Sequence, residues 1–213
     1  MFLYMIIILV VSTIFNWIVG SLNKGGFKNF WRVLCCTGIP VHELSHLLAC
    51  KIFRVPVVEV KLLNREKQGQ SETYNGHVTQ GSDSPHVVSS FVISFAPTLV
   101  AIPLSLFLLQ VLFLLTTPPM TDPKIIGIVV VGLFLLGIIS QCGPSIEDLS
   151  NFLKYSGGHK LQFLCFVVGC IIGYYLSEVL IVLPLEPLYV VVKMIVFFLP
   201  AWVLNKVVSH YQK

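Results

Sequence analysis

Charged residues are scarce in this chain. Only 11% of its 213 residues are Asp, Glu, Lys or Arg, while 55% are hydrophobic, and the mean hydropathy is +0.85. A soluble domain carries about 25% charged residues, so this chain has too few to cover a globular surface. We therefore expect an integral membrane protein. The net charge of +4 is small and spread along the loops, which gives no reason to expect a nucleic-acid partner.

Two further sequence patterns are missing. The six cysteines include no CxxC pair and do not form the framework of a small disulfide-rich secreted domain, so we interpret them as small buried side chains. Residues 1–20 lack the basic stretch and the small-residue cleavage site of a secretory signal peptide. We expect a first membrane helix there instead.

Long apolar runs, by contrast, are abundant. About 20 apolar residues in a helix cross a hydrocarbon core roughly 30 Å thick. Six candidate spans lie at about residues 1–20, 29–53, 87–116, 124–142, 160–183 and 187–207. The predicted fold is therefore an all-α polytopic membrane protein with about six transmembrane helices.

One connection between the predicted spans, residues 54–86, is long and polar. Residues 57–64 are rich in β-branched side chains, and residues 74–81 contain an Asn-Gly turn signal. We predict a small β-hairpin or sheet here, directly after the second span. The chain then divides into an N-terminal helix and loop (1–28), a core that includes the insert (29–155) and a C-terminal transmembrane hairpin (156–213).

The basic residues indicate an orientation. Lysine and arginine are concentrated in the loops after the second and fourth predicted spans and at the C-terminus, with Lys24 and Lys28 as exceptions. Because cytoplasmic loops are enriched in these residues, both termini and the insert are predicted to be cytoplasmic. We expect a multi-pass protein of a bacterial or archaeal cytoplasmic membrane, with its active site toward the cytoplasmic side.

The second predicted span contains a His-Glu-x-x-His motif, formed by His42, Glu43 and His46. Residues i and i+4 of a helix share one face about 6 Å apart along the axis, so the two imidazoles can hold one Zn²⁺. Glu43 lies about 100° around the helix, where it can reach a water on the metal. Ionisable groups in a span usually mark a functional site. The alternative is a structural cluster of polar side chains bonded between helices.

A catalytic zinc needs a third protein ligand. The predicted topology brings Asp148 to the depth of the histidines, so we predict Asp148 as that ligand, with Glu147 as the alternative. Residues 145–148 also match a helix capping box, a role that one carboxylate does not easily combine with metal binding. Asn151, one turn beyond Asp148, could orient Asp148, donate to an oxyanion or simply be a polar helix residue.

The motif His42-Glu43-Leu44-Ser45-His46 in a membrane span, the β-rich insert and the distant aspartate together resemble the site-2 protease family of intramembrane zinc metalloproteases. The resemblance covers about residues 29–155. The family usually carries its aspartate in an Asp-Gly context, whereas Leu149 follows Asp148 here. The resemblance implies one zinc per chain and hydrolysis of peptide bonds in membrane-embedded proteins, with Glu43 activating a zinc-bound water.

A transmembrane substrate must unwind locally before its peptide bonds can be attacked. The predicted strands could hold it extended by edge pairing, which makes Val58, Val60 and Leu62 candidate substrate contacts. Two alternative functions stay open. One is a membrane zinc protease of the prenyl-protein-processing type with Glu147 as third ligand, and the other is a non-enzymatic metal transporter or assembly factor. The oligomeric state is left open.

Overall fold

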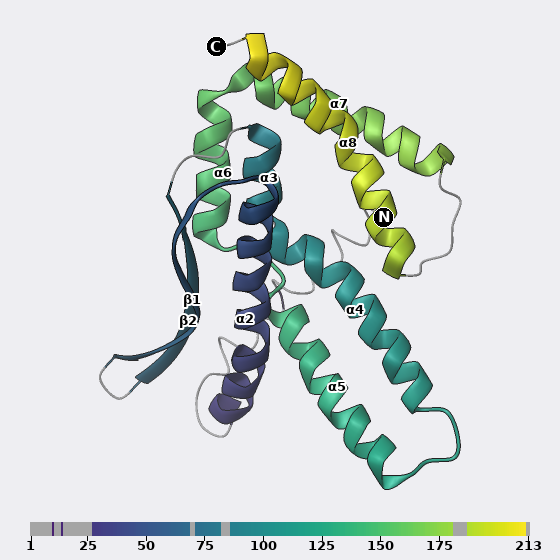
Figure 1. Cartoon of the computed structure of the whole chain (residues 1–213). Coiled ribbons are helices and arrows are strands. Elements are labelled where there is room, and N and C mark those ends of the chain that lie inside the picture. The colour runs from purple at the N-terminus through teal and green to yellow at the C-terminus, as the bar shows by residue number, and fades with distance from the viewer. Residues whose placement is uncertain are drawn as a thin grey trace.

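The computed structural model of the chain describes residues 10, 14, 27–68, 71–81, 86–180 and 187–211. The first predicted span, 1–20, lies outside these residues apart from two positions. The described part is mostly helical, with one small antiparallel sheet of two strands (Figure 1). This architecture confirms the predicted fold class at the level of helices plus a small sheet.

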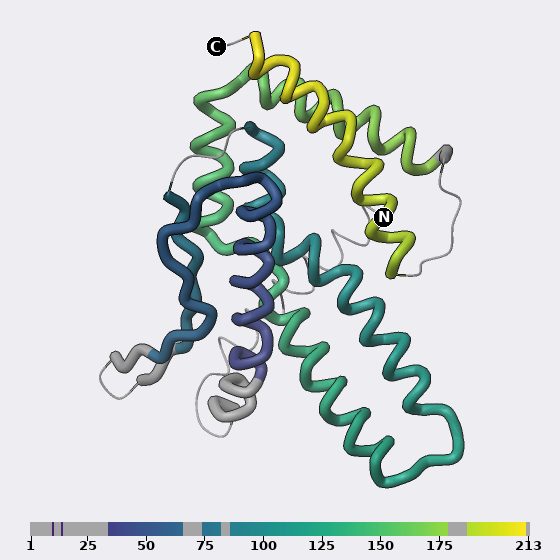
Figure 2. The backbone as a smooth tube through the Cα atoms, in the orientation of Figure 1, coloured from purple at the N-terminus to yellow at the C-terminus, as the bar shows by residue number. Residues whose placement is uncertain are grey.

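Helix α2 (Phe27–Ile52) carries the His-Glu-x-x-His motif and lies at the centre of the fold. The hairpin of β1 (Val57–Gln68) and β2 (Ser71–Gln80) packs along one side of α2. Helices α4 (Ala96–Leu115) and α5 (Asp122–Gln141) extend away from its other side as an antiparallel pair (Figure 2). The motif is therefore enclosed between a hairpin and a helix pair.

The hairpin confirms the predicted insert, and its reversal falls between the two segments, 57–64 and 74–81, that are predicted as strands. The strands pair from Val57 with Gln80 to Gln68 with Ser71, so the reversal comes between Gln68 and Ser71. The predicted turn signal at Gly76 lies inside β2 instead. A Cβ at Gly76 would collide with the side chain of Glu43, so this glycine allows β2 to approach α2 closely.

The third predicted span, 87–116, forms two helices. Helix α3 (Val87–Ser94) and α4 are separated by Phe95 alone, and Pro97 stands in the first turn of α4. Helix α6 (Ile146–Gly158) follows α5 after a short break at residues 142–145, which contains Pro144. Both breaks occur beside prolines because a proline lacks the N–H group that would continue a helix. Both breaks lie beside the second half of α2, where backbone carbonyls close to each break contact the two histidines of the motif.

The last two helices, α7 (Lys160–Leu180) and α8 (Pro187–Tyr211), form an antiparallel pair that packs mainly on itself (Figure 1). Gly169 and Gly173 of α7 lie against the backbone of Ala201 and Phe197 in α8, where a Cβ would collide. Small residues four apart allow such close contact between apolar helices.

Within the described residues, four helices are long and apolar enough to cross a membrane, namely α4, α5, α7 and α8. Most of the surface of these helices is exposed and apolar, as expected of a membrane protein. The prediction of six spans is not supported. The first span is outside the described part, and α2, which carries ionisable residues along its length, is not among the four.

Candidate metal centre

The two histidines of α2 face the same side of the helix. His42 and His46 are one turn apart, with ring centroids 4.8 Å from each other. Their Nε2 atoms are separated by only 3.1 Å. The helical spacing in the sequence therefore produces the predicted pair.

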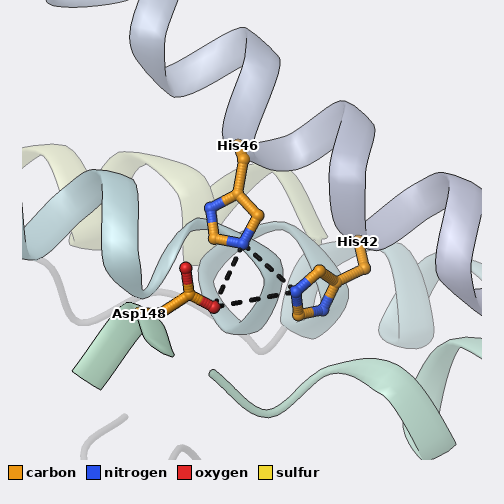
Figure 3. A group of neighbouring side chains, drawn as sticks. All are labelled: His42, His46 and Asp148. Atoms are coloured by element: carbon orange, nitrogen blue, oxygen red, sulfur yellow. Dashed lines mark hydrogen bonds and ion pairs between the residues drawn. The ribbon is translucent and has the colours of Figure 1, made fainter. Parts of the chain in front are cut away.

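Asp148, near the start of α6, completes a group of three (Figure 3). Its Oδ2 atom lies 3.4 Å from Nε2 of His46 and 3.8 Å from Nε2 of His42. The structure thus brings together three potential ligands that are far apart in the sequence. Such a His-His-Asp group could hold a metal ion.

Backbone carbonyls orient both imidazole rings. Nδ1 of His46 lies 2.7 Å from the carbonyl oxygen of Ile93, and Nδ1 of His42 lies 2.7 Å from that of Gln141. A carbonyl can only accept a hydrogen bond, so each Nδ1 carries a proton and donates it. In its neutral form, each ring then presents the lone pair of Nε2 toward the centre of the group, the usual arrangement of a histidine that binds a metal.

The distances within the group fit a zinc ion. Two Nε2 lone pairs that face each other at 3.1 Å repel, and a cation between them converts this repulsion into attraction. Ligand atoms about 2.0–2.1 Å from a tetrahedral zinc are roughly 3.4 Å from each other. The three separations here, 3.1, 3.4 and 3.8 Å, bracket this value. Two imidazoles and one carboxylate are also a donor set that zinc accepts while leaving a fourth position free.

Asp148 combines the two roles that the sequence analysis treats as competing. Its Oδ2 accepts hydrogen bonds from the backbone N–H (2.8 Å) and the hydroxyl (2.6 Å) of Ser145, which caps α6, and the same oxygen faces both histidines. Burial alone would raise the pKa of Asp148, but the neighbouring His46 ring and the bonds from Ser145 hold that pKa below its usual value. The capping box therefore keeps the carboxylate ionised and aimed at the histidines.

Glu43 is nearly buried, with 7% of its surface exposed, yet it lines the same cleft as the histidines. Gly76 of β2 packs directly against its side chain. The carboxylate is therefore confined between α2 and the hairpin, beside the group of ligands and not within it. The role of Glu43 as a general base stays a prediction.

The cleft has a volume of about 1450 Å³ and lies between α2, β2 and α6. Glu147 and Asn151 are exposed on α6 and line it, but neither belongs to the His-His-Asp group. Among the described residues, the strand that lines the cleft is β2, from Tyr74 to Gly81. The predicted substrate contacts Val58, Val60 and Leu62 lie on the neighbouring strand β1 and are exposed.

Sequence reasoning missed several supporting groups. The carbonyls of Ile93 and Gln141 are backbone groups, and the residue type at a position does not indicate that its carbonyl contacts a histidine. The available signal was a proline within four residues after each of them. The close contact of Gly76 with Glu43 was also missed, because the adjacent Asn75 made that dipeptide resemble a turn.

Thr98 secures the scaffold of the site. It is fully buried in α4, and its hydroxyl donates to the carbonyl of Cys142 at 2.6 Å. This bond ties the break before α6 to the start of α4.

Comparison with family models, with curated proteins and with solved structures gives no match.

Proposed function

We propose that this protein is a zinc-dependent endopeptidase that cleaves membrane-embedded protein substrates. The observation that carries the proposal is the convergence of His42, His46 and Asp148 beside the confined carboxylate of Glu43. Two neutral imidazoles and a carboxylate would hold one zinc ion per chain. When bound, the zinc would supply a Lewis acid and lower the pKa of a water at the site.

The protein's own residues would perform the remaining tasks. Glu43 would take the proton of the attacking water and pass it to the leaving amine, the role of the glutamate in this motif. The carbonyls of Ile93 and Gln141 would keep both rings in the productive orientation. Asn151 lines the cleft one turn beyond Asp148, where its amide could donate to an oxyanion.

The cleft supports an extended polypeptide as substrate. Among the described residues the sheet has two strands, so one edge of β2 has no partner strand there, and β2 lines the cleft from Tyr74 to Gln80. An unwound segment of a transmembrane protein could add to this edge as a third strand, which would hold its backbone in an extended conformation. The four described helices that are long and apolar enough to cross a membrane agree with a substrate that comes from the bilayer. We place the protein in a cytoplasmic membrane as a multi-pass protein, with the cleft toward the cytoplasm.

The geometry favours this proposal over the two alternatives. A prenyl-protein-processing enzyme would use Glu147 as third ligand, but Glu147 is exposed and Asp148 supplies the oxygen beside the histidines. A metal carrier or assembly factor needs no general base, whereas Glu43 is confined next to the ligand group at a cost in desolvation.

The test combines zinc content with hydrolysis of a labelled transmembrane peptide in detergent or vesicles. Wild type is expected to bind one zinc and to cleave. Glu43→Gln should keep zinc and lose turnover by at least about 10²-fold, the lower end for a general base. His46→Ala and Asp148→Asn should lose zinc, whereas Glu147→Gln should retain it.

Three results would contradict the proposal. A folded wild-type protein that takes up no zinc would leave the histidines as a structural cluster. Undiminished hydrolysis by Glu43→Gln would exclude Glu43 as the general base. Loss of zinc in Glu147→Gln with retention in Asp148→Asn would move the third ligand and favour the prenyl-protein-processing alternative.

A further inference from the structure

Pro97 lies in the first turn of α4, fully buried and on a different element from every proposed ligand. Ile93 precedes it by four residues, in α3. In a helix, the carbonyl of residue i accepts from the N–H of residue i+4, and a proline at i+4 has no N–H to give. The proline ring also crowds that carbonyl and turns it away from the helix axis.

The carbonyls around Ile93 show how local this effect is. The carbonyl of Phe91 accepts from the backbone N–H of Phe95 at 2.9 Å, and the carbonyl of Phe95 accepts from that of Leu99 at 3.0 Å. Helical bonding therefore continues on both sides of the proline. The carbonyl of Ile93 accepts from a backbone N–H at the C-terminal end of α3, but Pro97 offers it no i+4 donor. One of the two lone pairs of this oxygen is therefore left for another donor.

His46 supplies the second donor to this carbonyl oxygen. Its Nδ1 lies 2.7 Å from the carbonyl oxygen of Ile93, in a buried environment where water cannot readily compensate. Through this bond, a proline in α4 sets the tautomer and the orientation of a ring on α2. The bond directs Nε2 of His46 at Oδ2 of Asp148 and at His42.

We propose that Pro97 is a positioning residue for the metal centre. It leaves one lone pair of the carbonyl oxygen of Ile93 open, and this carbonyl holds His46 in the Nδ1–H form, with Nε2 ready to bind a cation. The inference rests on the proposed zinc site, and it adds a residue that does not touch the metal. A helix-breaking residue is thereby used to place a hydrogen-bond acceptor and not only to end a helix.

The test substitutes Pro97→Ala in the full-length protein and measures Zn²⁺ affinity by competition with a chromophoric chelator. Alanine restores an N–H that can donate to Ile93 and compete with His46. Loss of such an outer hydrogen bond typically costs 10–100-fold in metal affinity, and we expect a weakening in this range. The Co²⁺-substituted protein should show a changed d–d absorption spectrum, which a purely structural effect elsewhere would not alter.

Pro103→Ala is the matched control. Pro103 lies inside the same helix, and the carbonyl four residues before it belongs to Leu99, away from the histidines. This variant makes the same chemical change. Its zinc affinity should stay within about 3-fold of wild type, well short of the 10–100-fold loss expected when a hydrogen bond to a metal-binding histidine is lost. Equal affinity of Pro97→Ala and wild type would overturn the inference. So would an equal loss in both proline variants, since that would reflect a general change of α4.

A second measurement is independent of metal binding. In ¹⁵N-histidine-labelled protein without metal, the His46 ring, assigned through His46→Ala, should show a protonated Nδ1 in wild type and lose that preference in Pro97→Ala. Retention of the Nδ1–H signal in the variant would overturn the inference. If the zinc proposal fails, the wild-type protein itself takes up no zinc. If only this inference fails, wild type binds zinc and Pro97→Ala binds it equally well, so the two failures are distinguishable.

Discussion

A single oxygen of Asp148 serves the helix cap and the metal centre together. Oδ2 accepts two hydrogen bonds from Ser145 and still lies within 3.4 Å of Nε2 of His46. A carboxylate oxygen has enough lone-pair capacity for several partners, which is why the roles are compatible. Ser145 therefore supports the centre without touching either histidine.

Replacing Ser145 by alanine should affect both roles. The Ser145→Ala variant loses the hydroxyl that caps α6, at a cost of about 1 kcal/mol in the free energy of unfolding. It also loses a donor to Oδ2, so the pKa of Asp148 should rise toward its usual value and zinc affinity should fall about 10-fold, the lower end for an outer ligand contact. Chelator competition and NMR titration of Asp148 would measure the two effects.

Ser150 provides the control, because it is exposed on the same helix and is not among the residues lining the cleft. Ser150→Ala should leave the pKa of Asp148 and zinc affinity unchanged. Equal behaviour of the two serine variants would mean that the cap does not act on the centre.

The crossing of α2 and α5 controls the site at the level of elements. Gly38 of α2 faces Gly137 of α5, and a Cβ on Gly38 would collide with the carbonyl oxygen of Gly137 and the side chain of Gln141. Gln141 is also the residue whose carbonyl accepts from His42. The distance between these helices therefore decides whether that hydrogen bond can form.

We expect Gly38→Ala to separate the two helices. Overpacking of this kind costs about 1–3 kcal/mol in the free energy of unfolding, and zinc affinity should fall because His42 loses its acceptor. Thermal unfolding in detergent and chelator competition are the measurements. Gly132→Ala is the control, because Gly132 of α5 has no neighbour within 4 Å among the described residues and alanine favours a helix by up to about 1 kcal/mol. A Gly38→Ala protein as stable as wild type would contradict this interpretation.

Parts of the fold and the site were predictable because they depend on local geometry. The i, i+4 spacing of His42 and His46 fixes their common face, and alternation identifies the strand that begins at Val57. Asp148 required an additional argument from the order of apolar segments. The predicted trio does lie together.

Other features were not predictable because one residue type can serve two purposes. Gly76 after an asparagine indicates a turn, but here it allows close packing on Glu43. Pro97 lies inside one long predicted span, 87–116, whereas the structure has two helices there and a carbonyl of Ile93 that accepts from His46. Such choices depend on contacts between distant segments, which local patterns do not contain.

At the scale of the whole molecule, the four apolar helices define how it would lie in a bilayer. The connection between α4 and α5 and the one between α7 and α8 contain few basic residues, whereas the segments near the cleft contain many. By the positive-inside rule, the cleft side should face the cytoplasm. The cut substrate would then be released on that side.

Reporter fusions would test this orientation. An alkaline phosphatase moiety inserted in the loop after α4, at Met120, should be active because this enzyme folds only outside the cytoplasm. The same moiety after Lys213 should be inactive, whereas a green fluorescent protein there should fluoresce. Phosphatase activity at the C-terminus together with none at Met120 would reverse the predicted orientation.

The three ligands have a consequence for the thermodynamics of the chain. Histidines on α2 and a carboxylate on α6 belong to segments separated by most of the core sequence, so an ion between them would act as a removable cross-link that closes a long loop. Its binding energy would then be part of the folding energy. At a free zinc concentration 100 times the Kd, it would contribute about 2.7 kcal/mol of stability. The cell's zinc supply would thus set the lifetime of the folded protein as well as its activity.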